Sequence, residues 1–184
     1  MNLTGNAKEI LGSFLKKIES PILVDATCGN GFDTLFLAKC AQNSGKVFAF
    51  DVQKSAVENT RRLLAQNSAL DNVEIFQTSH EFLKEKIPQK YFGKINVAMF
   101  NLGWLPKSDK KIITNPESTL KALRALEEIA DKNQNLVSVL AYPAHDGGRR
   151  EFMEVEKYAA QFSPQVFKDA ANPDSPALFI FKMP

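Results

Sequence analysis

Two carboxylates and a glycine turn in the first third of the chain form the pattern with the clearest chemistry. An apolar run ends at Asp25, Gly29 and Gly31 follow as a Gly-x-Gly turn, and a second apolar run ends at Asp51. Glycines let the backbone approach a ligand closely, because a Cβ there would collide with it. An acid at the end of the second strand can accept hydrogen bonds from both ribose hydroxyls. The pattern therefore predicts a nucleoside-type cofactor site at the carboxyl edge of a parallel sheet.

The details of this turn favour one cofactor over others. The dinucleotide fingerprint needs a third glycine where this chain has Thr34, and the turn lacks the Lys-Ser/Thr pair of a P-loop. Asp25 would repel a pyrophosphate, but it suits the ammonium and sulfonium charges of S-adenosyl-L-methionine. We therefore predict S-adenosylmethionine as the cofactor, with a nicotinamide dehydrogenase as a distant alternative.

The residues that follow each strand are the candidate ligands, because ligands of parallel sheets lie beyond the carboxyl ends of the strands. Asp33 and Ser79 each have an alternative role as the N-cap of the helix that follows. His80 could stack on the adenine, form a hydrogen bond or be a surface turn residue. The predicted cofactor-binding residues are Asp25, Gly29, Asn30, Gly31, Asp33, Asp51, Gln53, Ser79 and His80.

The segment after the fourth predicted strand carries the candidate reaction centre. Asn101-Leu102-Gly103-Trp104 resembles the Asn/Asp-Pro-Pro-Tyr signature of methyltransferases that act on exocyclic or side-chain nitrogen, with Leu-Gly in place of Pro-Pro. In that signature the amide oxygen and a backbone carbonyl accept hydrogen bonds from the target amine, and the aromatic ring stacks on a planar base. Asn101 and Trp104 fit these two roles, and Trp104 could alternatively be a core residue.

Charged residues and a histidine cluster near the same predicted edge of the sheet. Either Asp109 or His145 could remove the proton from the target amine, and the residues alone leave this open. Basic side chains at this edge could meet phosphates, although most lysine clusters are solvated surface. The predicted substrate- or RNA-binding residues are Leu102, Gly103, Lys107, Lys110, Lys111, Arg149 and Arg150.

The elements that must position these residues alternate between strands and helices. Apolar periodicity predicts helices over 6–19, 33–42, 54–68, 81–86, 116–132 and 149–162, and strands over 22–26, 46–51, 73–77, 95–101, 136–142, 165–170 and 177–182. Internal strands that are apolar throughout are typical of a parallel sheet covered on both faces. The turn region 172–176 is too short for a crossover, so the last two strands should pair antiparallel. We predict an α/β, Rossmann-like class I methyltransferase fold with a seven-stranded, mostly parallel sheet and an antiparallel last strand.

Composition limits the remaining classes. The 184 residues suffice for one domain, expected over 1–184, and 44% hydrophobic residues with fourteen Phe are typical of a globular protein. No apolar run is long enough to span a membrane and the first residues do not resemble a signal peptide, so a cytoplasmic location is the default expectation. Two Cys and two His, far apart, argue against a disulfide framework and a zinc site. A net charge of +2 does not by itself indicate nucleic-acid binding.

Several motifs together resemble one group of small bacterial class I methyltransferases, the family labelled "putative rRNA methylase". The resemblance covers nearly the whole chain, and two departures are Trp104, where the family usually has Tyr, and Pro143, where a histidine of the family is missing. The matching residues are Asp25-Ala26-Thr27-x-Gly29-Asn30-Gly31-x-Asp33-Thr34, Phe50-Asp51-x-Gln53, His80-Glu81, Phe100-Asn101-Leu102-Gly103-Trp104-Leu105-Pro106 with Asp109-Lys110, and Pro116-Glu117-Ser118-Thr119.

The resemblance implies N-methylation of the aminomethyl group on the modified wobble uridine of tRNA, giving methylaminomethyl-thiouridine. It implies the tRNA anticodon loop as partner, with no metal and no membrane. Two alternatives stay open: an rRNA base or small-molecule N-methyltransferase with the same centre, and a non-catalytic SAM- or RNA-binding protein. The sequence also leaves open which tRNAs are used, whether thiolation comes first and whether the protein is a homodimer.

Overall fold

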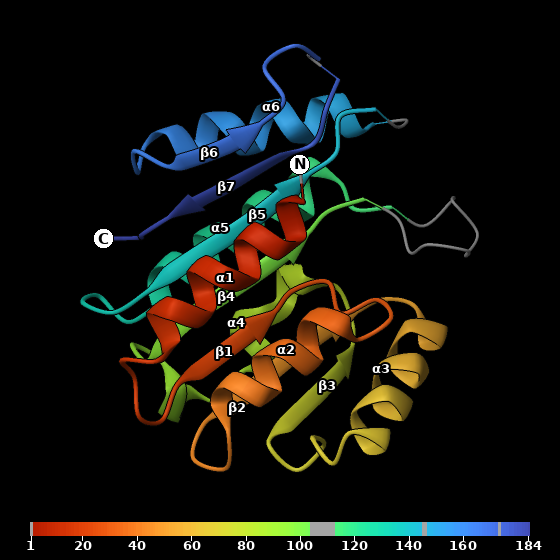
Figure 1. The fold of residues 1–184 in the computed structure, drawn as a ribbon, viewed down its shortest axis with the longest axis vertical. Helices are drawn as coiled ribbons and strands as arrows, with labels where there is room; N and C mark the ends of the chain where they lie inside the picture. Colours follow the sequence, from red (N-terminus) through yellow and green to blue (C-terminus); the bar gives the residue numbers. More distant parts are fainter. Residues whose placement is uncertain (1, 104–112, 145–146, 173) are drawn as a thin grey trace.

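The computed structural model describes residues 2–103, 113–144, 147–172 and 174–184. Its described strands form one seven-stranded sheet of order β3-β2-β1-β4-β5-β7-β6 (Figure 1). The strands are β1 Ile22–Asp25, β2 Lys46–Asp51, β3 Val73–Gln77, β4 Ile95–Asn101, β5 Leu136–Ala141, β6 Gln165–Lys168 and β7 Ala177–Phe181. The helices are α1 Leu3–Leu15, α2 Phe32–Ala41, α3 Lys54–Gln66, α4 Leu83–Lys86, α5 Pro116–Ile129 and α6 Gly148–Ala160, with 3-10 turns η1 His80–Phe82 and η2 Gln89–Tyr91.

The pairing of the strands confirms the predicted topology. Strands β3, β2, β1, β4 and β5 pair parallel to one another in this order. Strand β7 lies between β5 and β6 and is antiparallel to both. The short connection after β6 therefore makes a hairpin, because a parallel pair would need a longer crossover.

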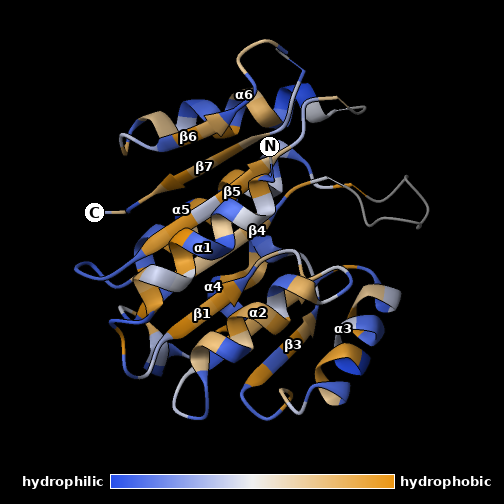
Figure 2. Ribbon diagram, viewed as in Figure 1, coloured by the Kyte–Doolittle hydropathy of each residue, from blue (hydrophilic) through white to orange (hydrophobic). Residues whose placement is uncertain are grey.

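Helices cover both faces of the sheet, which explains why its central strands are apolar throughout. Every residue of β1, β5 and β7 is buried, and the strands are mainly orange in the hydropathy view of Figure 2. One core cluster joins the sheet to α1, α2 and α3, and the other joins it to α4, α5 and α6. A sheet buried on both faces needs no polar side chains along its strands, so its polar groups gather where the strands end.

The ends of the helices differ from the predicted ranges by a few residues. Helix α1 begins at Leu3 instead of residue 6, because the Asn2 side chain accepts a hydrogen bond from the Gly5 N–H at 2.9 Å. It ends at Leu15, well before Pro21, so the predicted extension to residue 19 is wrong. The helix predicted over 81–86 is divided into η1 and α4.

No helix among the described residues is long and apolar enough to cross a membrane. The described residues also contain no group of three or more His, Cys, Asp or Glu side chains arranged to hold a metal ion.

Candidate active site

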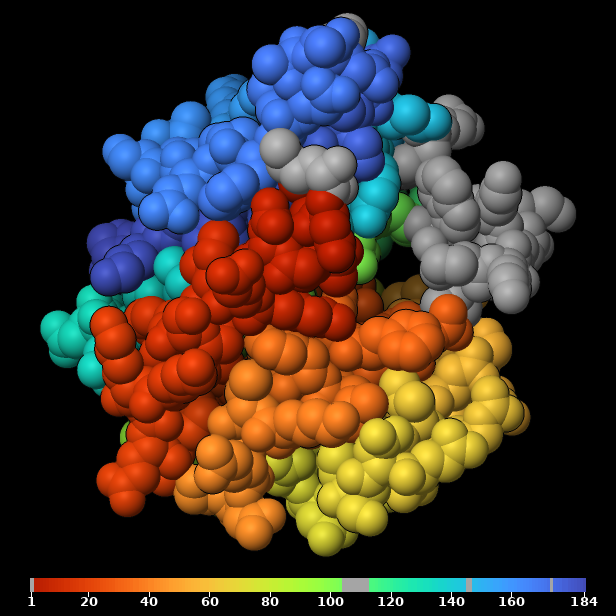
Figure 3. Space-filling model, viewed as in Figure 1, coloured from red at the N-terminus to blue at the C-terminus, as the bar shows by residue number. Residues whose placement is uncertain are grey.

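A cavity of about 1120 Å³ lies at the carboxyl ends of β1, β2 and β4, where the strand order reverses between β1 and β4. Open α/β sheets bind ligands at this switch point. The space-filling view shows the surface hollowed beside the orange segment around α2 (Figure 3). A pocket for one drug-sized ligand measures roughly 300–1,000 Å³, so the cavity has room for a cofactor and part of a second molecule.

The glycine turn and Asp51 form the floor of this cavity. The Asp51 carboxylate accepts backbone hydrogen bonds from Gly29 at 3.0 Å and from Gln53 at 2.9 Å. A carboxylate offers about four lone-pair sites, so Asp51 has capacity left to accept from a ligand. Burial raises the pKa of Asp51, and the backbone hydrogen bonds oppose that shift. The geometry fits a ribose whose two hydroxyls donate to this carboxylate.

Asp25 lies beneath the turn instead of on the cavity wall. Its side chain is 1% exposed and accepts hydrogen bonds from the Thr34 hydroxyl at 2.6 Å and from the Thr27 N–H at 3.2 Å. Burial, with the neighbouring Asp33 charge, raises the pKa of Asp25 to about 7. A cation bound in the cavity would favour the ionised form, so Asp25 can act on a ligand through its charge without touching it.

The start of α2 places Asp33 in the cavity wall. The N-cap of α2 is Gly31, whose φ of +86° suits glycine, so the alternative of Asp33 as an N-cap is wrong. Asp33 instead lies in the first turn and forms a 2.8 Å ion pair with Lys8 of α1. This pair joins two helices that border the cavity.

Ser79 and His80 follow β3 and border the cavity from another side. Ser79 is the N-cap of η1 and accepts a hydrogen bond from Glu81 N–H at 3.3 Å, which confirms its predicted capping role. His80 is 6% exposed, so its alternative as a surface turn residue is wrong. Its Nδ1 lies 3.2 Å from the Ala26 carbonyl, which can only accept, so Nδ1 carries the proton. Burial lowers the pKa of His80 to about 4, and the ring is neutral at pH 7.

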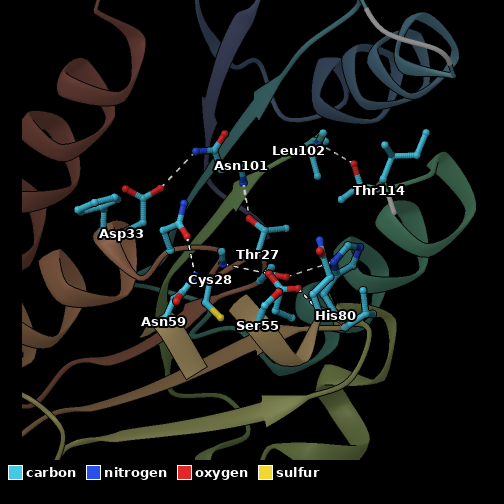
Figure 4. A pocket seen from close by; sticks show the side chains of 18 of the residues that line it. Thr27, Cys28, Asp33, Ser55, Asn59, His80, Asn101, Leu102 and Thr114 are labelled. Carbon is cyan, nitrogen blue, oxygen red and sulfur yellow. Dashed lines mark hydrogen bonds between the residues drawn. The ribbon is translucent and has the colours of Figure 1, made fainter. Parts of the chain in front are cut away.

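Asn101, at the end of β4, faces the same cavity (Figure 4). Its backbone N–H donates to the Thr27 hydroxyl at 2.7 Å, and its side-chain Nδ2 lies 3.5 Å from Asp33 Oδ2. The next residue, Leu102, is tied to β5 by a 2.9 Å hydrogen bond from its N–H to the Leu140 carbonyl. These bonds connect the start of the segment after β4 to Thr27, which follows β1, and to Leu140 in β5.

A partly buried hydrogen-bond network supports Gly103, the last described residue of this segment before residue 113. Gly103 donates its N–H to the Thr114 hydroxyl at 2.8 Å and accepts from the Thr114 N–H at 3.1 Å. The hydroxyls of Thr114 and Thr119 then donate to the two oxygens of Glu151, each at 2.7 Å. Glu151 belongs to α6 and is 2% exposed. The network therefore connects the segment after β4 to α5 and α6.

The structure brings together most of those predicted site residues that it describes. The predicted residues that line the cavity are Gly29, Asn30, Asp33, Asp51, Gln53, Ser79, His80, Asn101, Leu102 and Gly103. Asp25, Gly31, Arg149 and Arg150 do not belong to the described lining. Trp104, Lys107, Asp109, Lys110, Lys111 and His145 lie outside the described residues.

The two predicted arginines have acidic partners. Arg149 pairs with Asp174 at 2.7 Å, and Arg150 pairs with Glu117. All four side chains are more than half exposed, so these pairs contribute little to stability and a phosphate could compete for either arginine.

Some cavity residues carry no sequence signal that would identify them. Lys8 lies in an ordinary amphipathic helix, and Tyr142 follows β5 without a recognisable motif. Thr27 was visible in the glycine motif, but its hydrogen bond to the Asn101 backbone depends on the pairing of β1 with β4.

The sheet order, the antiparallel β7 and the carboxylate-and-glycine site at the switch point define a Rossmann-like class I SAM-dependent methyltransferase fold. A "putative rRNA-methylase" from Clostridium thermocellum superimposes with a TM-score of 0.90 at 30% identity, covering 99% of this chain and 97% of the other. A "putative methyltransferase" from Streptococcus mutans in complex with SAH has a TM-score of 0.77 at 29% identity, with 94% of each chain covered.

The family model described as "Putative rRNA methylase" matches residues 47–172. The chloroplastic tRNA (mnm(5)s(2)U34)-methyltransferase of Arabidopsis thaliana is 38% identical over 146 residues, which are 75% of this chain and 52% of that protein. The chain thus spans about half the length of this curated relative. The Ribosomal RNA small subunit methyltransferase H of Karelsulcia muelleri is 33% identical over 96 residues, 52% of this chain and 29% of that protein. The chain belongs to the "Putative rRNA methylase" family of SAM-dependent methyltransferases.

Proposed function

We propose that this protein transfers the methyl group of S-adenosylmethionine to the aminomethyl nitrogen on the modified wobble uridine of tRNA. The observation that carries the proposal is the position of Asn101, which faces the same cavity as Gly29 and Asp51. An acceptor for a target amine thus borders the space proposed for the cofactor. The Arabidopsis relative, whose name specifies this wobble nucleotide, supports the choice of substrate.

The described residues fit the cofactor. The Asp51 carboxylate has acceptor capacity left for ribose hydroxyls, and Gly29 brings backbone without a side chain to the same floor of the cavity. Asn30, Gln53, Ser79 and His80 are the further proposed cofactor contacts. Asp25 supports the turn from below through its hydrogen bonds with Thr27 and Thr34, and Gly31 ends the turn as the N-cap of α2. When bound, S-adenosylmethionine supplies a sulfonium methyl group to which a neutral amine can bond as the S–C bond breaks.

Asn101 and the Leu102 carbonyl have the task of directing the amine, by accepting hydrogen bonds from its N–H groups. A free alkylamine is mostly protonated at pH 7, and burial in the cavity is the effect that favours its neutral form. The backbone of both residues is held in place, at Asn101 by the Thr27 hydroxyl after β1 and at Leu102 by the Leu140 carbonyl of β5. The gain in rate would come mainly from this positioning. Asp109 and His145 stay the candidates for proton removal, and Trp104 stays the candidate for stacking on the base.

We further propose that the anticodon loop lies over the carboxyl edge of the sheet and contacts Gly103, Lys107, Lys110, Lys111, Arg149 and Arg150. Arg149 and Arg150 begin α6, near the described end of β5. Their acidic partners are exposed, so exchange of a carboxylate for a phosphate would cost little. The reaction would take place in the cytoplasm.

Nucleoside mass spectrometry of tRNA from a strain that lacks the gene tests the substrate. We expect aminomethyl-thiouridine to accumulate, and purified protein with S-adenosylmethionine should convert it to the methylaminomethyl form. The Asn101→Ala variant should bind SAH normally and lose at least ~100-fold in turnover, because a misplaced nucleophile costs about that much. Asn133→Ala, at an exposed position, is the matched control. An unchanged wobble nucleoside in the deletion strain would exclude this substrate.

Ribosomal RNA is the second candidate substrate, because the similarity to the Karelsulcia enzyme extends over half of this chain. Purified protein incubated with S-adenosylmethionine and either 16S rRNA or tRNA from the deletion strain separates the two. Methyl transfer to rRNA alone would favour this candidate, and transfer to neither would leave a small-molecule N-methyltransferase or a non-catalytic binding protein.

A further inference from the structure

Three polar side chains from three separate elements lie next to one another in series, and the last of them is the Asn101 amide. Lys8 of α1 pairs with Asp33 Oδ1 at 2.8 Å, and Asp33 Oδ2 lies 3.5 Å from Asn101 Nδ2. Figure 4 shows the amide nitrogen of Asn101 directed toward Asp33 and its oxygen directed away. All three residues line the cavity.

The chemistry of the carboxylate dictates which end of the amide faces it. An asparagine side chain carries an acceptor oxygen and a donor NH2 group, and a half-turn about its last bond exchanges them. An ionised carboxylate only accepts, so the NH2 group is attracted to Asp33 and the oxygen would be repelled. The Asn101 oxygen is thereby left on the side away from Asp33.

We propose that Asp33, held by Lys8, is a positioning residue that fixes the orientation of the Asn101 amide and presents its oxygen to the target amine. This inference rests on the function proposed above. It gives Asp33 a role different from the cofactor contact that the sequence predicts. The 3.5 Å separation is long for a hydrogen bond, and we expect it to shorten when the site is filled, as catalytic hydrogen bonds often do.

Lys8 determines which oxygen of Asp33 is available to Asn101. The Lys8 ammonium contacts Asp33 Oδ1 and also donates a hydrogen bond to the Phe32 carbonyl at 3.3 Å. It therefore binds the first turn of α2 at two points. The side chains of Lys8 and Asp33 are only 28% and 11% exposed, which limits screening of the pair by water. Oδ2 is the oxygen that remains on the Asn101 side.

A double-mutant cycle tests the proposal in the complete enzyme. Asp33→Asn is nearly isosteric and offers Asn101 either a donor or an acceptor, so the amide is no longer held in one orientation. We expect kcat to fall about 10- to 100-fold, because small losses of alignment cost this much, while SAH affinity and KM for S-adenosylmethionine change less than twofold. In the Asn101→Ala background the same substitution should have almost no further effect.

A substitution that removes the Lys8 charge gives an independent variant. Lys8→Met should lower kcat less than Asp33→Asn does. Lys8→Arg keeps the positive charge, so it should retain most of the kcat that Lys8→Met loses. Lys17→Met and Asp71→Asn, both at exposed positions, are the matched controls. A loss from Asp33→Asn that appears in SAH affinity, or that persists in full in the Asn101→Ala background, would overturn the proposal.

A measurement without substrate keeps this inference separate from the proposed function. In ¹⁵N-labelled protein, Asp33→Asn should shift the Asn101 Nδ2 proton resonances, because it replaces the carboxylate that faces this group, whereas Asp71→Asn should leave them unchanged. Asn101 Nδ2 proton resonances that do not change when Asp33 is replaced would refute the proposal. If the wild-type enzyme methylates no tRNA but the shift is present, the substrate assignment fails and the positioning role stands.

Discussion

The Asp51 carboxylate, at the end of β2, only accepts hydrogen bonds. It accepts them from the backbone at Gly29 and Gln53, and we propose that it also accepts them from a bound ligand. Hydrogen bonds to charged groups contribute about 1.5–3 kcal/mol each. Asp51→Ala should therefore weaken SAH binding by at least ~10-fold in isothermal titration calorimetry. Asp71 is an exposed carboxylate just before the amino end of β3, so Asp71→Ala should leave the SAH affinity unchanged. Equal affinities in wild type and Asp51→Ala would remove this residue from the cofactor site.

His80 gives the fold a defined dependence on pH. Its pKa is about 4 in the folded protein and about 6.5 when unfolded, so the unfolded chain binds more protons between these values. The stability that neutral His80 contributes is present above pH 6.5 and is lost as the pH falls toward 4. The stability contributed by Asp25 depends on pH in the opposite direction. Because its pKa is raised to about 7, that contribution is lost as the pH rises.

Comparison of the wild type with His80→Gln isolates the histidine, since Asp25 is common to both. Between pH 6.5 and 4.5 the wild type should lose about 2–3 kcal/mol of unfolding free energy relative to the variant. Urea unfolding followed by circular dichroism measures the difference at each pH. A difference that does not change with pH would mean that His80 is not buried as a neutral ring.

At the scale of elements, Glu151 joins α6 to the residues that flank and begin α5. Glu151→Ala would leave the Thr114 and Thr119 hydroxyls without their acceptor, and each such loss costs about 1–3 kcal/mol. We expect the free energy of unfolding to fall by roughly 2–5 kcal/mol in urea denaturation. Glu156→Ala lies on the same helix with an exposed 3.8 Å ion pair to Lys168, and it should change stability by less than about 0.5 kcal/mol. Similar effects of the two substitutions would show that the network is not a structural link.

At the scale of the whole molecule, the weak net charge of +2 means that RNA binding depends on where the charges lie. If Arg149 and Arg150 exchange their carboxylates for loop phosphates, their joint change to Gln should make the slope of log Kd against log[salt] shallower by about 1.4. Fluorescence anisotropy with an anticodon stem-loop at several salt concentrations gives the slope. Lys94→Gln, exposed just before β4 at the opposite edge, is the control. An unaltered slope would place the RNA elsewhere.

The sequence by itself determined the sheet, its topology and the edge at which we propose that the cofactor binds. Apolar strands followed by Asp25, Asp51 and Asn101 are local patterns, and the parallel order brings their ends together whatever the details of packing. Only the tertiary structure decided how these groups are supported. The contact of Lys8 with Asp33 arises because α1 and α2 pack on the same face of the sheet. Similarly, Glu151 reaches Thr114 across 37 positions of the chain. Such contacts depend on side chains that meet in space, and no periodicity or motif along the chain records them.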